Sequence, residues 1–394
     1  MVFPFSSPPP PPTAAPDNGI PYCTLFLCFS LLVWALELYI DLRQRRRLCE
    51  KQLPAELSQD FTDAEFSSAC DYSIDRISFK MLSDAMMTMS QVLFLLMGGF
   101  AWMWSVSAAL VRSCSFCPLG ASGQNEIVHS MAFCLVFLAK SVVESAPFDL
   151  YETFVLEERH GFNKQTLRLW VADQIKTNML IIMLGFPAIA FGIRIIQWAG
   201  PQMWLYVWGF CLVLLVVFMF VFPNVISPLF NTFAPLQEGE LKTAIEALAA
   251  ENKFPLKELF VIDGSQRSSH SNAYFYGFGS NKRIVLYDTL NPSLLKMPQA
   301  TTMEGNSDGD PVLVEKTDPV DPKKICTVDE IVAILAHELG HWALSHLPKQ
   351  LLLAEMHLLV FFFLFGHAMN SAEMFRSFGF TDERPIIIGL ILVS

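Results

Sequence analysis

Charged residues are scarce in this chain. Asp, Glu, Lys and Arg together make up 16% of its 394 residues, whereas hydrophobic residues make up 53%. An ordinary soluble domain has about 25% charged residues. The low charge content therefore excludes a typical soluble protein and indicates one that spans a membrane.

Basic residues are also missing in front of the first apolar run, Ile20–Ile40. Instead, arginines follow this run directly, at Arg43, Arg45, Arg46 and Arg47. A cleaved signal peptide carries its basic residues in front of its apolar run, so this order excludes one. Because basic residues mark the cytosolic end of a membrane helix, we expect an anchor whose N-terminus lies in the lumen.

The chain has no excess of positive charge either. Its formal net charge is -11, and the stretch Glu50–Asp75 holds seven acidic residues against the single base Lys51. Nucleic acids and anionic lipid surfaces bind basic patches. The charge balance therefore excludes both as the main partner, and we expect no binding to nucleic acid.

Two short patterns indicate no particular chemistry. The nine cysteines are scattered, and the one C-x-x-C pattern, Cys114 and Cys117, has no second pair to complete a metal site. A disulfide or plain loop residues explain it better than metal binding or redox function. The leading segment 1–19 contains the proline run Pro8–Pro12, which favours an extended luminal tail. This tail is a linker in the simpler interpretation and an adaptor-binding site in the alternative one.

Apolar runs of about 20 residues predict the membrane-spanning helices. Six runs are long enough to cross: Ile20–Ile40, Met86–Leu110, Ile127–Ala146, Thr177–Trp198, Met203–Ile226 and Leu351–Met369. A seventh run, Pro385–Val393, has nine residues. Such a run cannot cross a hydrocarbon core about 30 Å thick. We therefore expect the seventh helix to be incomplete and the chain to be truncated at its C-terminus.

The longest soluble stretch, 227–350, is predicted to form a cytosolic domain, because successive spans alternate in direction from a luminal N-terminus. A helical pattern and β-rich runs in this stretch predict an α+β fold. They cover Glu238–Asn252 for the helix, and Leu259–Ile262, Ala273–Tyr276 and Ile284–Tyr287 for the strands. Residues 298–324 have almost no apolar pattern and are predicted as a flexible insertion. The other predicted parts are a membrane domain with five spans over 20–226, and the sixth and incomplete seventh helices over 351–394.

The pattern H-E-x-x-H occurs in this stretch at His337, Glu338 and His341. Histidines four positions apart lie about 40° apart around a helix, so both imidazoles can reach one zinc ion, with the glutamate beside it as a candidate general base. Thr327 and Glu330 have the spacing of a capping box, which starts a helix. Apolar residues then recur at helical spacing: Val328, Ile331, Val332, Leu335 and Leu339. The simpler alternative is a helix whose histidines only pack or meet solvent.

Other ionisable residues leave alternatives open. Lys140 and Glu144 are four positions apart in the third span, so they can pair on one helix face. The pair is either a structural ion pair or the polar wall of an internal cavity. His346 lies nine positions after His337, about 180° around the same helix, so it cannot complete the zinc site if the helix continues.

Four segments together resemble the type I CAAX prenyl proteases, the multi-span zinc endopeptidases of the endoplasmic reticulum. They are Glu158–Thr166, Asn224–Leu236, Gly264–Gly277, and His337–Trp342 with Leu344 and His346. The resemblance runs from about the first span to the end of the chain. It implies a multi-pass α-helical membrane protein with a cytosolic, α+β, zincin-like metalloprotease domain.

The resemblance also implies an activity and a site. Proteases of this family remove the last three residues after a prenylated cysteine, so prenylated CAAX proteins or peptides and membrane lipid would be the partners. His337 and His341 would bind one Zn2+ ion per chain, and Glu338 would activate water at an active site that faces the cytosol. The substrate would add as a β-strand to an edge segment, which corresponds to Asn272, Ala273 and Tyr274.

One departure from the family concerns the third zinc ligand. Family members supply it from a glutamate well downstream, and this sequence ends before such a segment. Glu355 and Glu373 are poor substitutes, because the first enters a span and the second falls on the luminal side. We therefore expect two protein ligands from this sequence. The alternative functions are a catalytically impaired form or pseudoprotease that binds lipid or client proteins without cleavage, and a bacterial-type membrane quality-control metalloprotease, which has fewer spans.

Overall fold

The computed structural model describes residues 21–59, 61–113, 125–277, 279–295 and 325–393. The predicted tail 1–19, the pair Cys114 and Cys117, and the insertion 298–324 lie outside the described residues. The described chain forms two compact units. One contains the residues up to His160, Lys176–Phe210 and the residues from Leu358 onward, and the other contains Gly161–Ile175 and Cys211–His357.

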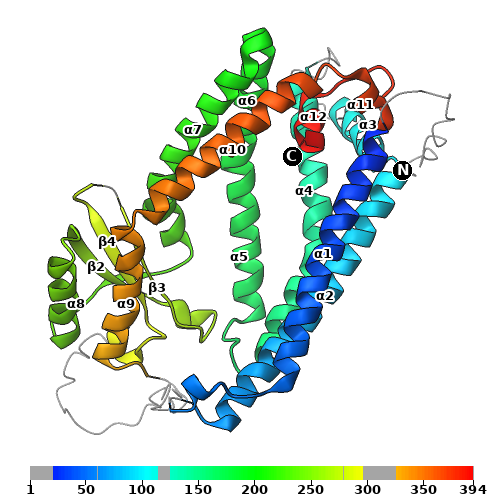
Figure 1. Cartoon of the computed structure of the whole chain (residues 1–394). Helices are drawn as coiled ribbons and strands as arrows, with labels where there is room; N and C mark the ends of the chain where they lie inside the picture. The colour runs from blue at the N-terminus through cyan, green and yellow to red at the C-terminus, as the bar shows by residue number, and fades with distance from the viewer. Residues whose placement is uncertain (1–20, 60, 114–124, 278, 296–324, 394) are drawn as a thin grey trace, which may run out of the picture. The chain divides into compact units, whose positions relative to one another are not determined.

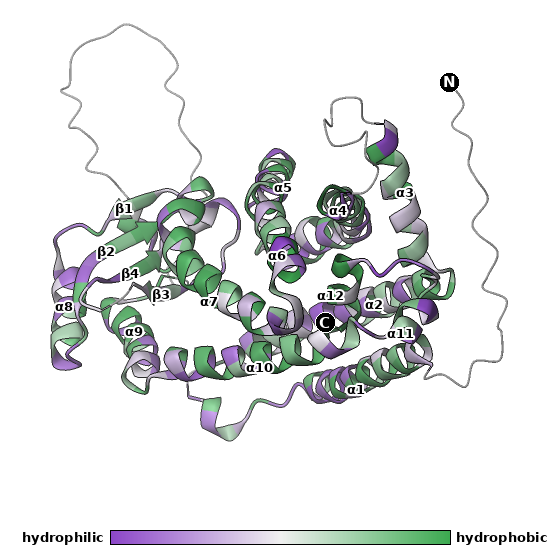
Figure 2. Ribbon diagram, turned by 90° about the horizontal axis from the view of Figure 1, so that it is seen from above, coloured by the Kyte–Doolittle hydropathy of each residue, from purple (hydrophilic) through white to green (hydrophobic). Residues whose placement is uncertain are grey.

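Helices build the first unit (Figure 1). They are α1 (Tyr22–Glu50), α2 (Asp63–Leu96), α3 (Gly99–Ser113), α4 (Glu126–Tyr151), α6 (Phe186–Ala199), α11 (Ala372–Ser377) and α12 (Ile386–Val393). Three further helices run through both units: α5 (Leu167–Leu180), α7 (Met203–Val221) and α10 (His346–Ala368). Nearly all residues of α7 and α12 are hydrophobic (Figure 2), as expected of helices that face lipid or pack inside a bundle.

By length and composition, four helical stretches of the described chain are suited to cross a membrane. They are α1, α4 with the turn after it (Glu126–Glu157), the stretch Leu167–Leu229, and α10. A fifth is added if α2 and α3 count as one span. The chain is therefore a multi-pass helical membrane protein, and the number of six complete spans stays a prediction.

The run Met86–Leu110, expected as one span, is bent. α2 ends at Leu96, α3 begins at Gly99, and the two helices meet at 73°. Gly98 has a φ of +67°, which glycine adopts without strain. A Cβ on Gly99 would lie 2.3 Å from the ring of Phe94. The two glycines therefore permit a sharp bend, so this span is a bent pair and not one continuous helix.

α6 and α7 fold back on each other. The ring centroids of Phe191 and Phe210 are 5.2 Å apart, and those of Trp198 and Tyr206 are 5.4 Å apart. The chain reverses at Gly200, whose φ is +57°. This long stretch therefore contains two antiparallel helices, in agreement with the two apolar runs in its sequence.

A four-stranded sheet forms the centre of the second unit. Its strands β1 (Phe233–Pro235), β2 (Leu256–Ile262), β3 (Ala273–Tyr276) and β4 (Lys282–Tyr287) lie in the order β1-β2-β4-β3. β2 and β4 are parallel, whereas β1 and β3 are antiparallel to their neighbours. The three predicted β-rich runs are confirmed as strands. β1 has three residues and is too short to show an alternating pattern in the sequence.

Two helices, α8 (Glu240–Glu251) and α9 (Val328–Ala343), pack on this sheet and on each other (Figure 1). Ile245 of α8, Leu286 of β4 and Ile331 of α9 are buried in one hydrophobic core. Each such side chain stabilises the fold by about 1.5–3 kcal/mol. The predicted α+β character of this region is confirmed, and the shared core fixes α9 against the sheet.

Candidate active site

α9 begins at a capping box. The Thr327 N–H donates a hydrogen bond to Glu330 Oε2 at 2.7 Å, and the Glu330 N–H donates to Thr327 Oγ1 at 3.3 Å. Ile331, Leu335 and Leu339 are each 1% exposed and pack into the core beneath the helix. The predicted helix and its start are therefore confirmed, and its buried face determines which side chains point outward.

His337, Glu338 and His341 lie on α9, away from its buried face. Both histidines are exposed and Glu338 is half-buried. The two imidazole centroids are 4.8 Å apart, with an angle of 88° between the rings. Two exposed imidazoles this close on adjacent helical turns fit one divalent metal ion, with a carboxylate next to them.

α9 does not continue to His346. The helix ends at Ala343, Ser345 has a φ of +53°, and α10 begins at His346. This turn brings Nδ1 of His346 to 2.7 Å from Nδ1 of His341. The sequence placed His346 on the far side of the zinc helix only if that helix continued, and α9 ends at Ala343. Pro348 is the signal in the sequence, because proline fits the first turn of a helix and indicates a helix start just before it.

β3 lies at the edge of the sheet and contacts α9. β4 pairs with one side of β3, and no strand of the described residues pairs with the other side. The Tyr287 N–H donates a hydrogen bond to the Asn272 carbonyl at 3.1 Å. Because hydrogen-bonded pairs alternate along an antiparallel ladder, the backbone groups of Tyr274 face β4, and those of Ala273 and Phe275 face the free edge.

The three residues expected to bind substrate lie at this edge in different surroundings. Asn272 is exposed, and its Oδ1 accepts a hydrogen bond from the Ala273 N–H at 2.8 Å. Ala273 is buried, and Tyr274 is half-buried with its ring centroid 6.3 Å from that of Tyr287. Burial, with the neighbouring Tyr287, raises the pKa of Tyr274 to about 12. The phenol therefore stays neutral at physiological pH.

Contacts from distant segments hold the loop before β3. The Ser269 N–H donates a hydrogen bond to the Phe162 carbonyl at 3.0 Å, and the rings of Phe162 and His270 stack with centroids 4.3 Å apart. Arg267 donates to the Phe230 carbonyl at 2.7 Å. The structure thus brings together, in one unit, residues from three of the four segments that carry the family resemblance.

Two buried carboxylates hold the same loop. Asp263 accepts hydrogen bonds from the Thr232 N–H at 2.8 Å and from the Gln266 side chain at 2.6 Å, and Asp288 accepts one from the Ser265 N–H at 2.9 Å. A buried carboxylate is stable only when it is paired in this way. These two acids therefore stabilise the loop that leads to β3. No local pattern in the sequence indicates this role.

Among the described residues, no group of three or more His, Cys, Asp or Glu side chains is arranged to hold a metal ion. The described chain therefore brings together two candidate ligands, the histidine pair on α9. Glu355 lies in α10 and Glu373 in α11. The third ligand implied by the resemblance stays an expectation.

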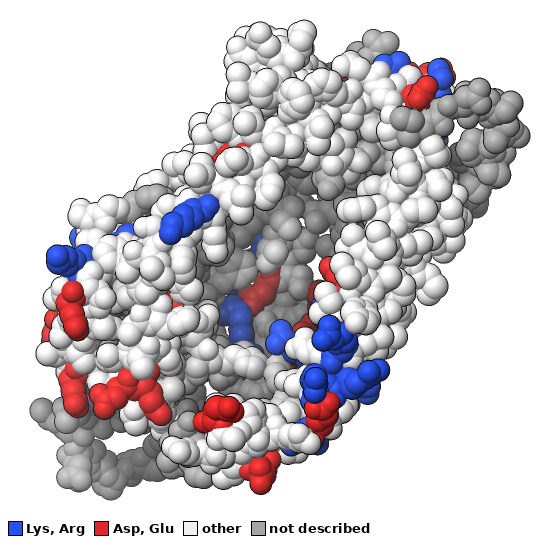
Figure 3. Space-filling view, in the orientation of Figure 1, with Lys and Arg blue, Asp and Glu red and all other residues white. Residues whose placement is uncertain are grey.

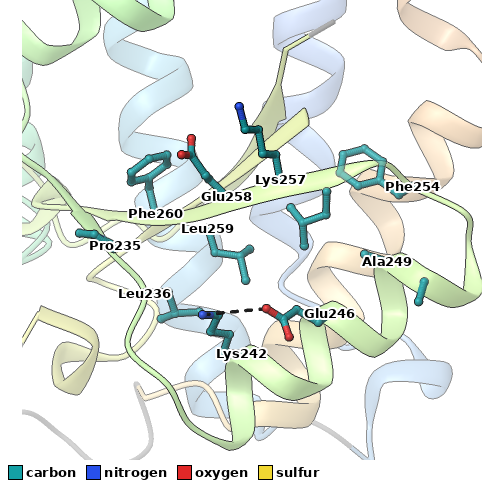
Figure 4. Close-up of a pocket in the computed structure, with 12 residues that line it drawn as sticks. Pro235, Leu236, Lys242, Glu246, Ala249, Phe254, Lys257, Glu258, Leu259 and Phe260 are labelled. Carbon is teal, nitrogen blue, oxygen red and sulfur yellow. Dashed lines mark ion pairs between the residues drawn. The ribbon is translucent and has the colours of Figure 1, made fainter. Parts of the chain in front are cut away.

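The cavity shown in Figure 4 lies between α8 and the strands β1 and β2, and its volume is about 450 Å³. Leu259 points from β2 toward α8, where Lys242 and Glu246 form an ion pair at 4.0 Å. None of the residues that line the cavity belongs to the expected site. We therefore assign it no part in catalysis.

In the first unit, Lys140 and Glu144 form the expected pair. Lys140 Nζ lies 2.5 Å from Glu144 Oε2 and 4.8 Å from the ring centroid of Phe94. Ser90 donates a hydrogen bond to the other oxygen of Glu144 at 2.8 Å. Both residues of the pair also line a cavity of about 660 Å³. The ion pair expected from the sequence is therefore confirmed, and the two side chains also form part of the wall of this cavity.

Two exposed histidines and a half-buried glutamate on α9, in a chain with several membrane-length helices, indicate a membrane-bound metalloprotease. Residues 44–232 match a family model described as CAAX prenyl protease N-terminal, five membrane helices, and residues 235–394 match Peptidase family M48. The chain belongs to the CAAX prenyl protease 1 family of M48 peptidases.

Relatives from distant organisms match nearly the whole chain. The CAAX prenyl protease 1 homolog of Oryza sativa subsp. japonica is 40% identical over 374 residues, which cover 95% of this chain and 79% of the relative. The Homo sapiens homolog is 37% identical over 378 residues, with 93% and 78% covered. CAAX prenyl protease 1 of Saccharomyces cerevisiae is 32% identical over 397 residues, with 97% and 80% covered.

A solved structure also matches this chain over nearly its whole length. The crystal structure of S. mikatae Ste24p superposes with a TM-score of 0.80 at 32% identity, covering 95% of this chain and 82% of that chain. The resemblance drawn from the sequence is therefore confirmed, and so are its coarse consequences: a multi-pass helical membrane region, an M48 peptidase domain and a metalloprotease.

Proposed function

We propose that this chain is a zinc endopeptidase that removes the last three residues of farnesylated or geranylgeranylated CAAX proteins. The observation that supports the proposal is the exposed pair His337 and His341 on a helix that contacts the edge strand β3. The substrate class follows from the relatives, which are named CAAX prenyl proteases.

Each residue of the motif has a separate role in this proposal. His337 and His341 would hold a zinc ion, which would supply Lewis-acid chemistry to the scissile carbonyl and lower the pKa of a bound water. Glu338 takes a proton from that water and passes it to the leaving amine. Leu339 is buried under the same turn, so the three side chains project from a helix that is fixed to the core.

The substrate binds along β3 as an added strand. The Ala273 carbonyl and both backbone groups of Phe275 face the free edge, where an extended peptide can bond to them, whereas the Ala273 N–H already donates to Asn272 Oδ1. Such bonds do not depend on the side chains of the substrate. This mode of binding suits a protease that acts on several CAAX sequences. Asn272 and Tyr274 belong to the same edge segment and would also contact the substrate.

The protein resides in the endoplasmic reticulum membrane, and its active site faces the cytosol. The arginines from Arg43 to Arg47 are exposed near the end of α1, where Figure 3 shows basic side chains gathered. Basic residues favour the cytosolic side of a membrane helix. Membrane lipid surrounds the apolar helices and also takes up the apolar prenyl group of the substrate.

Glu338→Gln tests the proposed mechanism. Glutamine keeps the shape of the side chain but cannot accept the proton, so zinc content should be unchanged while cleavage of a farnesylated CAAX peptide falls at least about 100-fold. His337→Ala should lose zinc and cleavage together. Undiminished cleavage by Glu338→Gln, or full zinc content in His337→Ala, would overturn the proposal.

A further inference from the structure

The turn between α9 and α10 places two imidazoles in hydrogen-bond contact. Nδ1 of His341 lies 2.7 Å from Nδ1 of His346, and the ring centroids are 5.0 Å apart. In a continuous helix, five positions correspond to a rotation of about 140°, which would separate these rings. The left-handed conformation of Ser345 is what brings them together.

Other contacts hold this turn in place. The Ser345 N–H donates a hydrogen bond to the Trp342 carbonyl at 2.9 Å, and Lys349 Nζ donates to the Leu344 carbonyl at 2.9 Å. Trp342 packs edge-on against Phe254, with centroids 5.2 Å apart. These contacts hold the turn in addition to the contact between the two histidines.

The hydrogen bond determines where the protons lie. A bond between two Nδ1 atoms needs one nitrogen with a proton and one without. A neutral histidine that binds metal through Nε2 carries its proton on Nδ1 and donates it to a partner. If His341 is a ligand, it is the donor and His346 is the acceptor, which leaves Nε2 of His341 for the metal.

We propose that His346 is a positioning residue of the metal site, whose Nδ1 accepts the hydrogen bond of His341 and fixes the orientation and tautomer of that ligand. This inference rests on the proposed function, because it treats His341 as a ligand. Partners of this kind orient metal-binding histidines, and their loss typically lowers metal affinity 10- to 100-fold.

Three substitutions distinguish this hydrogen bond from simple packing. Asparagine places a polar atom two bonds from Cβ, as Nδ1 of histidine is, so His346→Asn keeps an acceptor in place. His346→Gln moves the amide one bond further out, and His346→Ala removes it. Zinc affinity of the purified full chain, measured by competition with a chelating dye, should fall 10- to 100-fold in the Ala and Gln variants and by less than about threefold in the Asn variant.

The matched control is His367→Ala, which removes another histidine of α10, one bonded to the Phe363 carbonyl at 2.9 Å. It should leave zinc affinity unchanged. Unaltered affinity in His346→Ala, or equal losses in the Asn and Ala variants, would overturn the inference. Complete loss of zinc in His346→Ala, as expected for His341→Ala, would make His346 a ligand and also overturn it. These outcomes differ from those that would overturn the proposed function. The proposed function fails if Glu338→Gln still cleaves the peptide or if the unaltered protein binds no zinc.

Discussion

Arg267 and Asp173 form a two-point ion pair between positions 94 residues apart: Nε lies 2.8 Å from Oδ2, and Nη2 lies 3.1 Å from Oδ1. The same guanidinium donates hydrogen bonds to the Phe230 carbonyl at 2.7 Å and to Asn231 Oδ1 at 3.0 Å. A planar group with several fixed donors suits this arrangement better than a flexible ammonium. One side chain therefore holds three segments together and fixes the loop that leads to β3.

Replacement of this arginine by lysine should destabilise the second unit. Arg267→Lys keeps the charge but loses the paired geometry, so we expect a loss of about 1–3 kcal/mol in the free energy of unfolding. Chemical denaturation of the purified protein measures it. Arg168→Lys is the control, since Arg168 is an exposed residue of α5. Equal stability of Arg267→Lys and the control would show that the paired geometry has no structural importance.

The capping box of α9 gives a second prediction. Thr327→Ala removes the acceptor of the Glu330 N–H hydrogen bond and should cost about 1 kcal/mol of stability. Thermal unfolding followed by circular dichroism detects this loss. Asp329→Asn in the same turn is the control, because it leaves the cap intact. If Thr327→Ala and the control unfold at the same temperature, the cap does not stabilise the protein.

The same cap predicts a dependence on pH. Hydrogen bonds from the backbone and the hydroxyl of Thr327 hold the pKa of Glu330 below its usual value. A lowered folded pKa means that the contribution of this carboxylate is present above its ordinary pKa, and it is lost as the pH falls through the lowered value. The difference in stability between Glu330→Gln and the unaltered protein should therefore shrink as the pH falls below the ordinary pKa of a glutamate. A constant difference from neutral pH to pH 3 would contradict this account.

Local patterns in the sequence predict part of this structure. The start of α9 and its buried face follow from Thr327, Glu330 and the helical spacing of apolar residues, because caps and periodicity act within a few positions. β3 is predicted with its observed bounds, Ala273–Tyr276, since aromatic residues favour strands. The motif His337–His341 is equally local, so its place on the helix was predictable.

Contacts that depend on the tertiary fold are not predictable in this way. The pair Arg267 and Asp173 joins distant segments, and no spacing rule connects them. His346 reaches His341 only because α9 ends at Ala343, and Pro348 indicates a helix start nearby but not the direction in which the chain turns. A single sequence therefore indicates the ligand pair but not the residue that contacts one of its members.

Breaking the pair in α4 should weaken the first unit. Glu144→Gln leaves the Lys140 ammonium without its carboxylate in a cavity among apolar helices, so we expect a loss of about 2 kcal/mol. Thermal stability of the detergent-solubilised protein measures it. The double variant Lys140→Gln with Glu144→Gln should be more stable than Glu144→Gln alone. If Glu144→Gln is as stable as the unaltered protein, the ion pair does not stabilise the fold.

Topology gives a fifth prediction. The proposed orientation places the segment that contains Asp308 in the cytosol and Asn370 in the lumen, because the arginines after the first helix favour the cytosolic side. In sealed microsomes, added protease should remove a tag inserted at Asp308 and spare one at Asn370. Detergent should make both tags accessible, as a control. The reverse protection pattern would refute the orientation.

If the substrate binds to β3 as a strand, its cleavage should require the backbone N–H of every second peptide residue. The free edge presents groups from Ala273 and Phe275 but not from Tyr274, so a paired peptide meets it at every second residue. In a series of farnesylated peptides, each N-methylated at one position, methylation should lower kcat/KM about tenfold at alternate positions, because it removes one hydrogen bond and adds a steric clash. Methylation at the intervening positions should have little effect and serves as the control, because it adds the same group on the side that faces away. Equal losses at neighbouring positions, or no loss at any position, would show that the peptide does not bind β3 as a strand.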